Sequence, residues 1–253
     1  MRKLLSVIYY EYVMQLKRIA TWGVLAASVV ITLLDGFPSE KNLARIEFLL
    51  QPSYFIYRSL SFGALIATFG LMFLLSNRMA IDHKTGMKQL IMASPITKLQ
   101  YIFGKLLGGF IYTYTVFSLF LALNTLVFYV SVPIDIALTD CLVPFSKALI
   151  INVLPVSIFI SFISVALPAI VDVRLFYVLA SVLFILNAAS PDSADKMPFY
   201  LITSGDLKKL IWQHPKFPYI NTDGIQANLL FLIGCGLISA VPLFLRRKLW
   251  RND

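Results

Sequence analysis

Six long apolar runs divide the chain, and polar or charged residues bound each of them. Because a helix needs about 20 mostly apolar residues to cross the hydrocarbon core of a bilayer, these runs predict membrane-spanning helices. The first and fifth runs are the shortest and would need local thinning of the bilayer or flanking polar residues. We expect an all-α integral membrane protein with six transmembrane helices, at Ile19–Leu34, Ser59–Asn77, Leu106–Val130, Ala148–Val171, Leu175–Ala189 and Ala227–Leu245.

The first 18 residues follow a different pattern, in which apolar positions recur at nearly helical spacing. The positions between them are polar, and several are basic. This pattern predicts an amphipathic helix that lies in the membrane interface before the first span. It serves either as a simple anchor or as an elbow that transmits force to that span. The apolar positions are Leu4, Leu5, Ile8, Tyr12, Leu16 and Ile19.

Two segments outside the spans stand out. Residues 78–105 are short, charged and rich in turn signals, and they join the second and third spans. Residues 190–226 contain four prolines and join the fifth and sixth spans. Within this longer loop, Ser204–Trp212 is expected to form a short helix with Ser204 as its N-cap.

Composition supports the membrane class. The chain is 58% hydrophobic and 14% charged, whereas a soluble domain carries about 25% charged residues. We therefore treat residues 1–253 as a single transmembrane domain, partnered by the lipid bilayer of the plasma membrane. If both termini are cytoplasmic, 14 of the 22 Lys and Arg residues fall on the cytoplasmic side, as the positive-inside rule requires. Topology thus accounts for the net charge of +9, and no nucleic-acid partner is expected.

The sequence lacks the motifs of an energy-coupling or catalytic site. It contains no G-x-x-x-x-G-K-[ST] phosphate loop, no H-E-x-x-H motif and no Cys or His residues at zinc spacing. His83 and His214 fall on opposite sides of the predicted membrane, and no charged residue lies in the middle third of a span. We therefore expect no catalytic residue, no metal site and no cofactor on this chain. Energy for any transport would come from a partner.

Several spans carry small or weakly polar residues at helical spacing. Such residues allow helices to approach closely, and the serine face of the fourth span is alternatively a substrate path, formed by Ser157, Ser161 and Ser164. Prolines within the spans are expected to kink them. The small residues are Gly63, Ala67 and Gly70 in the second span, Gly104 and Gly108 in the third, and Gly236 and Ala240 in the sixth; the prolines are Pro155, Pro168 and Pro242.

The segment between the second and third spans predicts a short transverse helix between two turns. Gly86 ends the helix that continues from the second span, and Met87–Ala93 is long enough for about two helical turns. Ser94 precedes Pro95, which disfavours the helical conformation at Ser94. Thr97 then caps a new helix that runs through Gly104 and Lys105 into the third span.

This pattern resembles the membrane subunits of type-2 ABC exporters, the ABC-2 permease family. The matching residues are Asp82, Gly86, Leu90, Ser94, Pro95, Gly104 and Lys105. The chain departs from the family pattern at Met87, where members often carry Thr, but the layout of helices and loops is similar throughout. The resemblance implies that the segment is a coupling helix that docks on an ATPase subunit. The implied coupling residues are Asp82, His83, Lys84, Gly86, Lys88, Leu90, Ser94 and Pro95.

The resemblance also implies the partners and the activity. A second permease copy, identical or a close paralogue, and two ATP-binding ABC subunits complete the exporter, with ATP and Mg²⁺ held by the ATPase subunits. The aromatic-rich spans, in a chain with 20 Phe and 12 Tyr, favour a hydrophobic or amphipathic cargo, such as a peptide, an antibiotic or a lipid-like molecule. By analogy, antimicrobial-peptide transport is expected. Polysaccharide export is the alternative within the family, and a non-transporting membrane interaction or sensor protein is the alternative outside it.

Overall fold

The computed structural model describes residues 2–46, 48–60, 62–76, 78–84, 86, 96–132, 136–189, 206–212 and 222–245. Every regular element within these residues is a helix, which confirms the predicted all-α class. Five helical segments in the described part are long and apolar enough to span a membrane. They are Ile19–Gly36, Pro52–Ser76, Lys98–Ser131, Leu138–Ile170 and Asp223–Leu245.

The helices follow one another with short connections through most of the described chain. In order they are α1 (Arg2–Leu16), α2 (Ile19–Gly36), α3 (Glu40–Arg45), α4 (Pro52–Ser59), α5 (Phe62–Ser76), α6 (Arg78–Lys84), α8 (Lys98–Ser131), α9 (Leu138–Ala148), the π-helix η1 (Leu149–Val153), α10 (Leu154–Ile170), α11 (Val173–Ala189), the 3₁₀ helix η2 (Asp206–Leu210) and α12 (Thr222–Leu245).

The predicted spans agree best with the structure where an apolar run is uninterrupted. The first, fifth and sixth predicted runs correspond to α2, α11 and α12. The α11 helix has 17 residues and is not among the five long spans, and its segment Val173–Leu186 is a shorter apolar helix. The predicted second span corresponds to α5, and α4 lies before it, in residues that except for Ser59 are outside the predicted spans.

Two helices begin well before their apolar runs. The third predicted span starts at Leu106, but α8 starts at Lys98, where Thr97 and Gln100 form a reciprocal capping box. The fourth predicted span starts at Ala148, but the helical segment starts at Leu138 and includes Pro144. Both extensions contain polar residues, so a search for apolar runs does not detect that they are helical.

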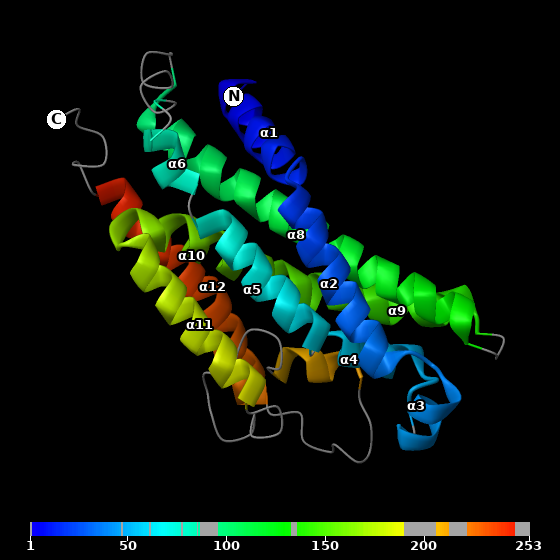
Figure 1. The fold of residues 1–253 in the computed structure, drawn as a ribbon. Coiled ribbons are helices and arrows are strands. Elements are labelled where there is room, and N and C mark those ends of the chain that lie inside the picture. The colour runs from blue at the N-terminus through cyan, green and yellow to red at the C-terminus, as the bar shows by residue number, and fades with distance from the viewer. Residues whose placement is uncertain are drawn as a thin grey trace.

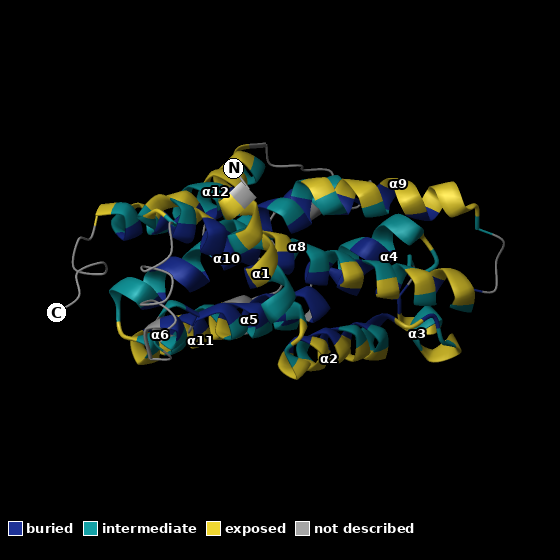
Figure 2. Cartoon of the chain, turned by 90° about the horizontal axis from the view of Figure 1, so that it is seen from above, coloured by how far each residue is buried: buried dark blue, intermediate teal, exposed yellow. Residues whose placement is uncertain are grey.

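The helices form an elongated bundle (Figure 1). Exposed residues occupy the outer faces of α2, α9 and α12, while buried residues face the centre, where α8 and α10 pack (Figure 2). At one end, Lys98 at the start of α8 donates a hydrogen bond of 2.8 Å to the carbonyl of Phe244 near the end of α12. We call this end, which also carries α6, the α6 end.

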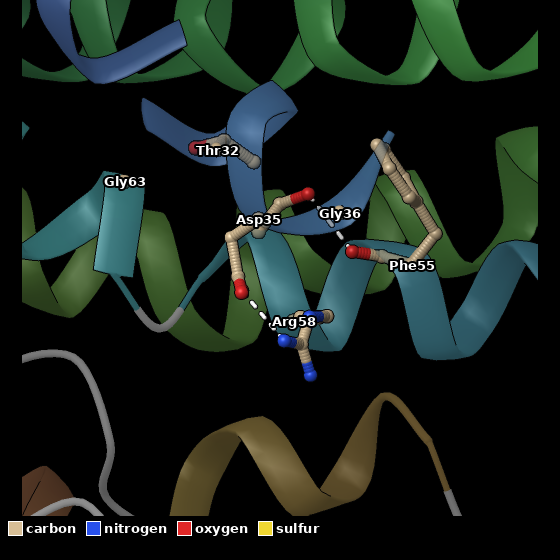
Figure 3. A pocket seen from close by; sticks show the side chains of 7 residues that line it. Thr32, Asp35, Gly36, Phe55, Arg58 and Gly63 are labelled. Carbon is tan, nitrogen blue, oxygen red and sulfur yellow. Dashed lines mark hydrogen bonds and ion pairs between the residues drawn. The ribbon is translucent and has the colours of Figure 1, made fainter. Parts of the chain in front are cut away.

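The opposite end, which we call the α4 end, carries α3, α4 and the start of α9 (Figure 1). Phe55 of α4 stacks on Phe128 of α8 with ring centroids 4.4 Å apart. Asp35, at the end of α2, forms an ion pair of 2.7 Å with Arg58 of α4 (Figure 3). The η2 helix supplies the expected short helix of the long loop, and Ser204 lies outside the described residues.

Small residues bring the helices close together, as the sequence predicts. A Cβ atom added to Gly63 of α5 would lie 1.6 Å from Oγ1 of Thr32 in α2, so no side chain fits there. A Cβ at Gly70 would lie 2.5 Å from Cγ1 of Val24. Before Pro155, which lacks an N–H donor, the backbone adopts the π-helical turn η1. This turn accommodates the proline within a continuous helical segment.

Candidate functional site

Both flanks of the predicted coupling segment have the expected structure. The helix after α5 ends at Lys84, and Gly86 adopts a φ of +70° that favours glycine. On the other flank, the Oγ1 of Thr97 accepts a hydrogen bond from the Gln100 N–H, which confirms the predicted cap. Lys88, Leu90, Ser94, Pro95 and the predicted helix Met87–Ala93 lie outside the described residues. His83 and Lys84 are placed by their backbone on the last turn of α6.

Asp82, the acidic residue of the coupling pattern, is buried at the α6 end. Its Oδ2 accepts a hydrogen bond of 2.7 Å from the hydroxyl of Tyr101 and pairs with Nζ of Lys105, also at 2.7 Å. Tyr101 and Lys105 lie four residues apart on the first turns of α8, so they share one helix face. Asp82 therefore fastens α6 to the start of α8.

Glu11 of α1 completes this arrangement from the other side. Its Oε1 accepts a hydrogen bond from Nε of Arg78 at 2.8 Å, and its Oε2 pairs with Nζ of Lys105 at 2.5 Å. Gln15, one turn further along α1, donates to Oε1 of Glu11 at 2.8 Å. Lys105 thus bridges the carboxylates of Glu11 and Asp82. We call Glu11, Arg78, Asp82, Tyr101 and Lys105 the Glu11 network.

The Glu11 network is buried and electrically balanced. Its two carboxylates and two cations are each no more than 5% exposed, and the formal charges cancel. Burial opposes ionisation of Glu11, but Lys105 and Arg78 outweigh that effect and lower the pKa of the carboxyl below its ordinary value of 4.5. Glu11 is therefore an anion at neutral pH, and the network is held by charge-assisted hydrogen bonds.

Two glycines on α8 allow α1 to come close enough for these contacts. A Cβ atom at Gly104 would lie 2.3 Å from Cγ1 of Val7, and one at Gly108 would lie 2.8 Å from Cβ of Glu11. The Cβ at Gly108 would also lie 3.0 Å from the carbonyl oxygen of Ile8, a backbone atom that cannot rotate away. The small residues predicted at the start of the third span therefore pack against α1.

The charged groups of the Glu11 network are paired with one another. Each carboxylate is already paired with a cation, and each of the four charged residues is almost completely withdrawn from solvent. Among the described residues, no three His, Cys, Asp or Glu side chains converge in a way that would hold a metal ion. The network ties α1, α6 and α8 into one unit at the base of the predicted coupling segment.

Sequence reasoning selected Asp82 and Lys105 but missed the residues that join them to α1. Glu11 lies within the predicted amphipathic helix and Arg78 at the start of the segment 78–105, and neither position predicts a contact with Asp82 or Lys105. One sequence signal was available: Glu11 is the single acidic residue in the first 34 positions. An isolated acid on a basic, amphipathic helix is a candidate partner for buried cations.

The predicted serine face lies inside the bundle. Ser157, Ser161 and Ser164 are fully buried on α10, and the hydroxyl of Ser161 donates to the carbonyl of Ser157 at 2.8 Å. A Cβ at Gly109 of α8 would lie 3.7 Å from Cβ of Ser161, so α8 packs directly on this face. The geometry fits close helix packing, and a substrate path along these serines stays a prediction.

Comparison of the chain with protein-family models, with curated proteins and with solved structures gives no match.

Proposed function

We propose that the chain is the membrane-spanning subunit of an ATP-driven exporter of the ABC-2 type, powered by a separate ATPase. In this proposal α11 is the fifth of six spans, α12 is the sixth, and α1 lies at the membrane interface. The basic α6 end, with both termini, faces the cytoplasm, and residues 190–226 lie outside. The cargo is hydrophobic or amphipathic, and a second permease copy completes the pathway.

The observation that carries the proposal is the position of the Glu11 network. Asp82 lies two residues before the end of α6, and Tyr101 and Lys105 lie on the first turns of α8. The network therefore spans the base of the segment between α6 and α8, and Glu11 connects that base to α1. Force applied to residues 85–95 would reach α1, α6 and α8 together.

Burial suits the network to this task. A buried ion pair contributes little net stability compared with apolar residues of the same size, but it fixes how helices register against each other. A rigid joint of this kind transmits a displacement instead of absorbing it. The ATPase would supply the displacement through the different affinity of its open and closed states for ATP.

The test is a charge reversal in the proposed coupling segment. The full chain is expressed with the phosphate-loop ATPase encoded by a neighbouring reading frame, co-purified and reconstituted in proteoliposomes. We expect Lys84→Glu with Lys88→Glu to lower ATPase association and cargo-stimulated hydrolysis by about tenfold or more, which corresponds to a loss of about 1.4 kcal/mol.

The matched control is Lys41→Glu with Lys147→Glu, because both lysines are exposed on helices outside the α6 end. This control should leave association and hydrolysis unchanged. Equal behaviour of the two double variants would contradict the coupling role. If the wild-type chain binds no such ATPase, the alternative of a non-transporting interaction or sensor protein is favoured. If only polysaccharide stimulates ATP hydrolysis, the cargo is a polysaccharide.

A further inference from the structure

An apolar groove on the outside of the bundle lies between α2, α5 and α11. Its volume is about 590 Å³, which is within the range of about 300–1,000 Å³ that is usual for small-molecule sites. Three of the four residues that α2 contributes to the groove are small and lie one helical turn apart, and the fourth is Val24. The residues that define it are Ala20, Gly23 and Ala27 of α2, Gly70 and Phe73 of α5, and Ser181 of α11.

The α2 wall of the groove is short enough to lie within one leaflet of a bilayer. From Ala20 to Ala27 the wall runs about 10 Å along the axis of α2, at 1.5 Å per residue. The hydrocarbon of one leaflet is about 15 Å deep, half of a core of about 30 Å. Gly23 has no heavy atom within 4 Å of the position where a Cβ would lie, so the groove is open at its middle.

Two arginines lie near one end of the groove, Arg18 before α2 and Arg174 at the start of α11, where Asp172 accepts a hydrogen bond of 2.7 Å from the Arg174 N–H. Arg18 directly precedes α2, and its Nη1 donates to the carbonyl of Leu74, next to the wall residue Phe73, at 3.0 Å. A guanidinium carries five N–H donors, so this single bond leaves capacity for a phosphate. Phe73 also contacts Tyr177 of α11, with ring centroids 5.4 Å apart. Arg174, exposed one turn before Tyr177, lies on the same side of α11.

We propose that this groove binds an anionic phospholipid, with one acyl chain along α2 and the headgroup phosphate at Arg18 and Arg174. Charge complementarity favours an anionic lipid over a zwitterionic one, because basic residues near a membrane surface attract anionic headgroups. The proposal rests on the membrane embedding in the proposed function and is independent of the ATPase.

The experiment fills the groove without disturbing its neighbours. The full chain is purified without any ATPase, and lipid binding is followed by native mass spectrometry during titration with dioleoyl phosphatidylglycerol or dioleoyl phosphatidylcholine. We expect the wild-type chain to bind one phosphatidylglycerol in preference to phosphatidylcholine. Gly23→Leu should weaken that binding about tenfold, the effect of losing about 1.4 kcal/mol.

The matched control is Gly234→Leu on α12, where an added Cβ also meets no heavy atom within 4 Å and which is not part of the groove. It should bind phosphatidylglycerol as the wild-type chain does. A second variant, Arg18→Gln with Arg174→Gln, should reduce the affinity for phosphatidylglycerol to that for phosphatidylcholine, whereas Lys147→Gln on α9 should preserve the preference.

Three results would overturn the proposal. In the first, Gly23→Leu binds phosphatidylglycerol as tightly as Gly234→Leu. In the second, inorganic phosphate at millimolar concentration displaces the lipid completely, which would indicate a phosphate site without a chain site. In the third, Gly23→Leu converts a dimer into monomers with lipid binding unchanged, which would show that a second copy covers the groove. Because the ATPase is absent, each result leaves the coupling proposal standing.

Discussion

The two ends of the bundle use the same chemistry in different surroundings. At the α6 end, Glu11 pairs with Arg78 and Lys105, and the three side chains are 3–5% exposed. At the α4 end, Asp35 pairs with Arg58 (Figure 3) and with Arg45. There the side chains of Asp35, Arg45 and Arg58 are 31%, 59% and 25% exposed.

Burial gives these two clusters different roles. Water reaches the partly exposed pairs of Asp35 and screens them, so we expect them to contribute about 1 kcal/mol or less. Removing one partner of a buried pair leaves an uncompensated charge and costs about 3–5 kcal/mol. We therefore expect the Asp35 pairs to hold the end of α2 near α3 and α4 only weakly, whereas the contacts of α1 with α6 and α8 should depend strongly on each member of the Glu11 network.

The largest expected effect comes from removing the acid at the buried end. Glu11→Ala would leave Arg78 without its ion-pair partner and Lys105 with only Asp82. We expect a loss of about 3–5 kcal/mol of stability, seen as a lower apparent melting temperature of the purified chain at a fixed scan rate.

A double substitution separates lost charge from lost packing. Glu11→Leu with Arg78→Met removes one acid and one base, and it leaves the pair of Asp82 and Lys105 intact. We expect the double variant to recover most of the stability, because apolar replacement of a whole buried pair is often neutral. If it is as unstable as Glu11→Ala, the charge balance of the network is not what holds this end together.

Acid should produce a smaller effect that has the same origin. Because the cations lower the pKa of Glu11 below 4.5, its contribution is fully present above the pKa of the unfolded chain, near 4.5, and is lost as the pH falls through the lower folded pKa. Thermal scans between pH 7 and pH 3 should show this loss in the wild-type chain. In Glu11→Gln that part of the pH dependence should be absent. Parallel curves for the two chains would contradict the assignment.

Most of the fold could be predicted from local sequence signals. The apolar runs define α2, α11 and α12 closely, and the turn at Gly86 and the cap at Thr97 follow from the conformational preferences of single residues. The early starts of α8 and α9 could not be read from hydropathy, because Lys98, Asp140 and Lys147 interrupt the apolar pattern while the backbone remains helical.

The site was only half predictable, for a physical reason. Asp82 and Lys105 belong to a short local pattern, whereas Glu11 lies 94 positions from Lys105. Their contact depends on α1 lying on Gly104 and Gly108, and the periodicity of α1 indicates only that one of its faces is apolar. Which helix packs against α1 is decided by the tertiary structure, and the residue pattern of α1 alone does not predict it.

The smallest effects are expected at the exposed end. Asp35→Asn removes one carboxylate from Arg45 and Arg58 and should cost no more than about 1 kcal/mol. Arg45→Gln should cost less still, because Arg45 is the most exposed member and its contact with Asp35 is longer, at 3.4 Å against 2.7 Å for Arg58.

Both variants are measured in the same melting series as Glu11→Ala, at low and high salt. Added salt should reduce the stability loss caused by Asp35→Asn and leave the loss caused by Glu11→Ala unchanged, because screening acts on exposed charges far more than on buried ones. An Asp35→Asn loss that matches Glu11→Ala and resists salt would mean that burial does not distinguish the two ends.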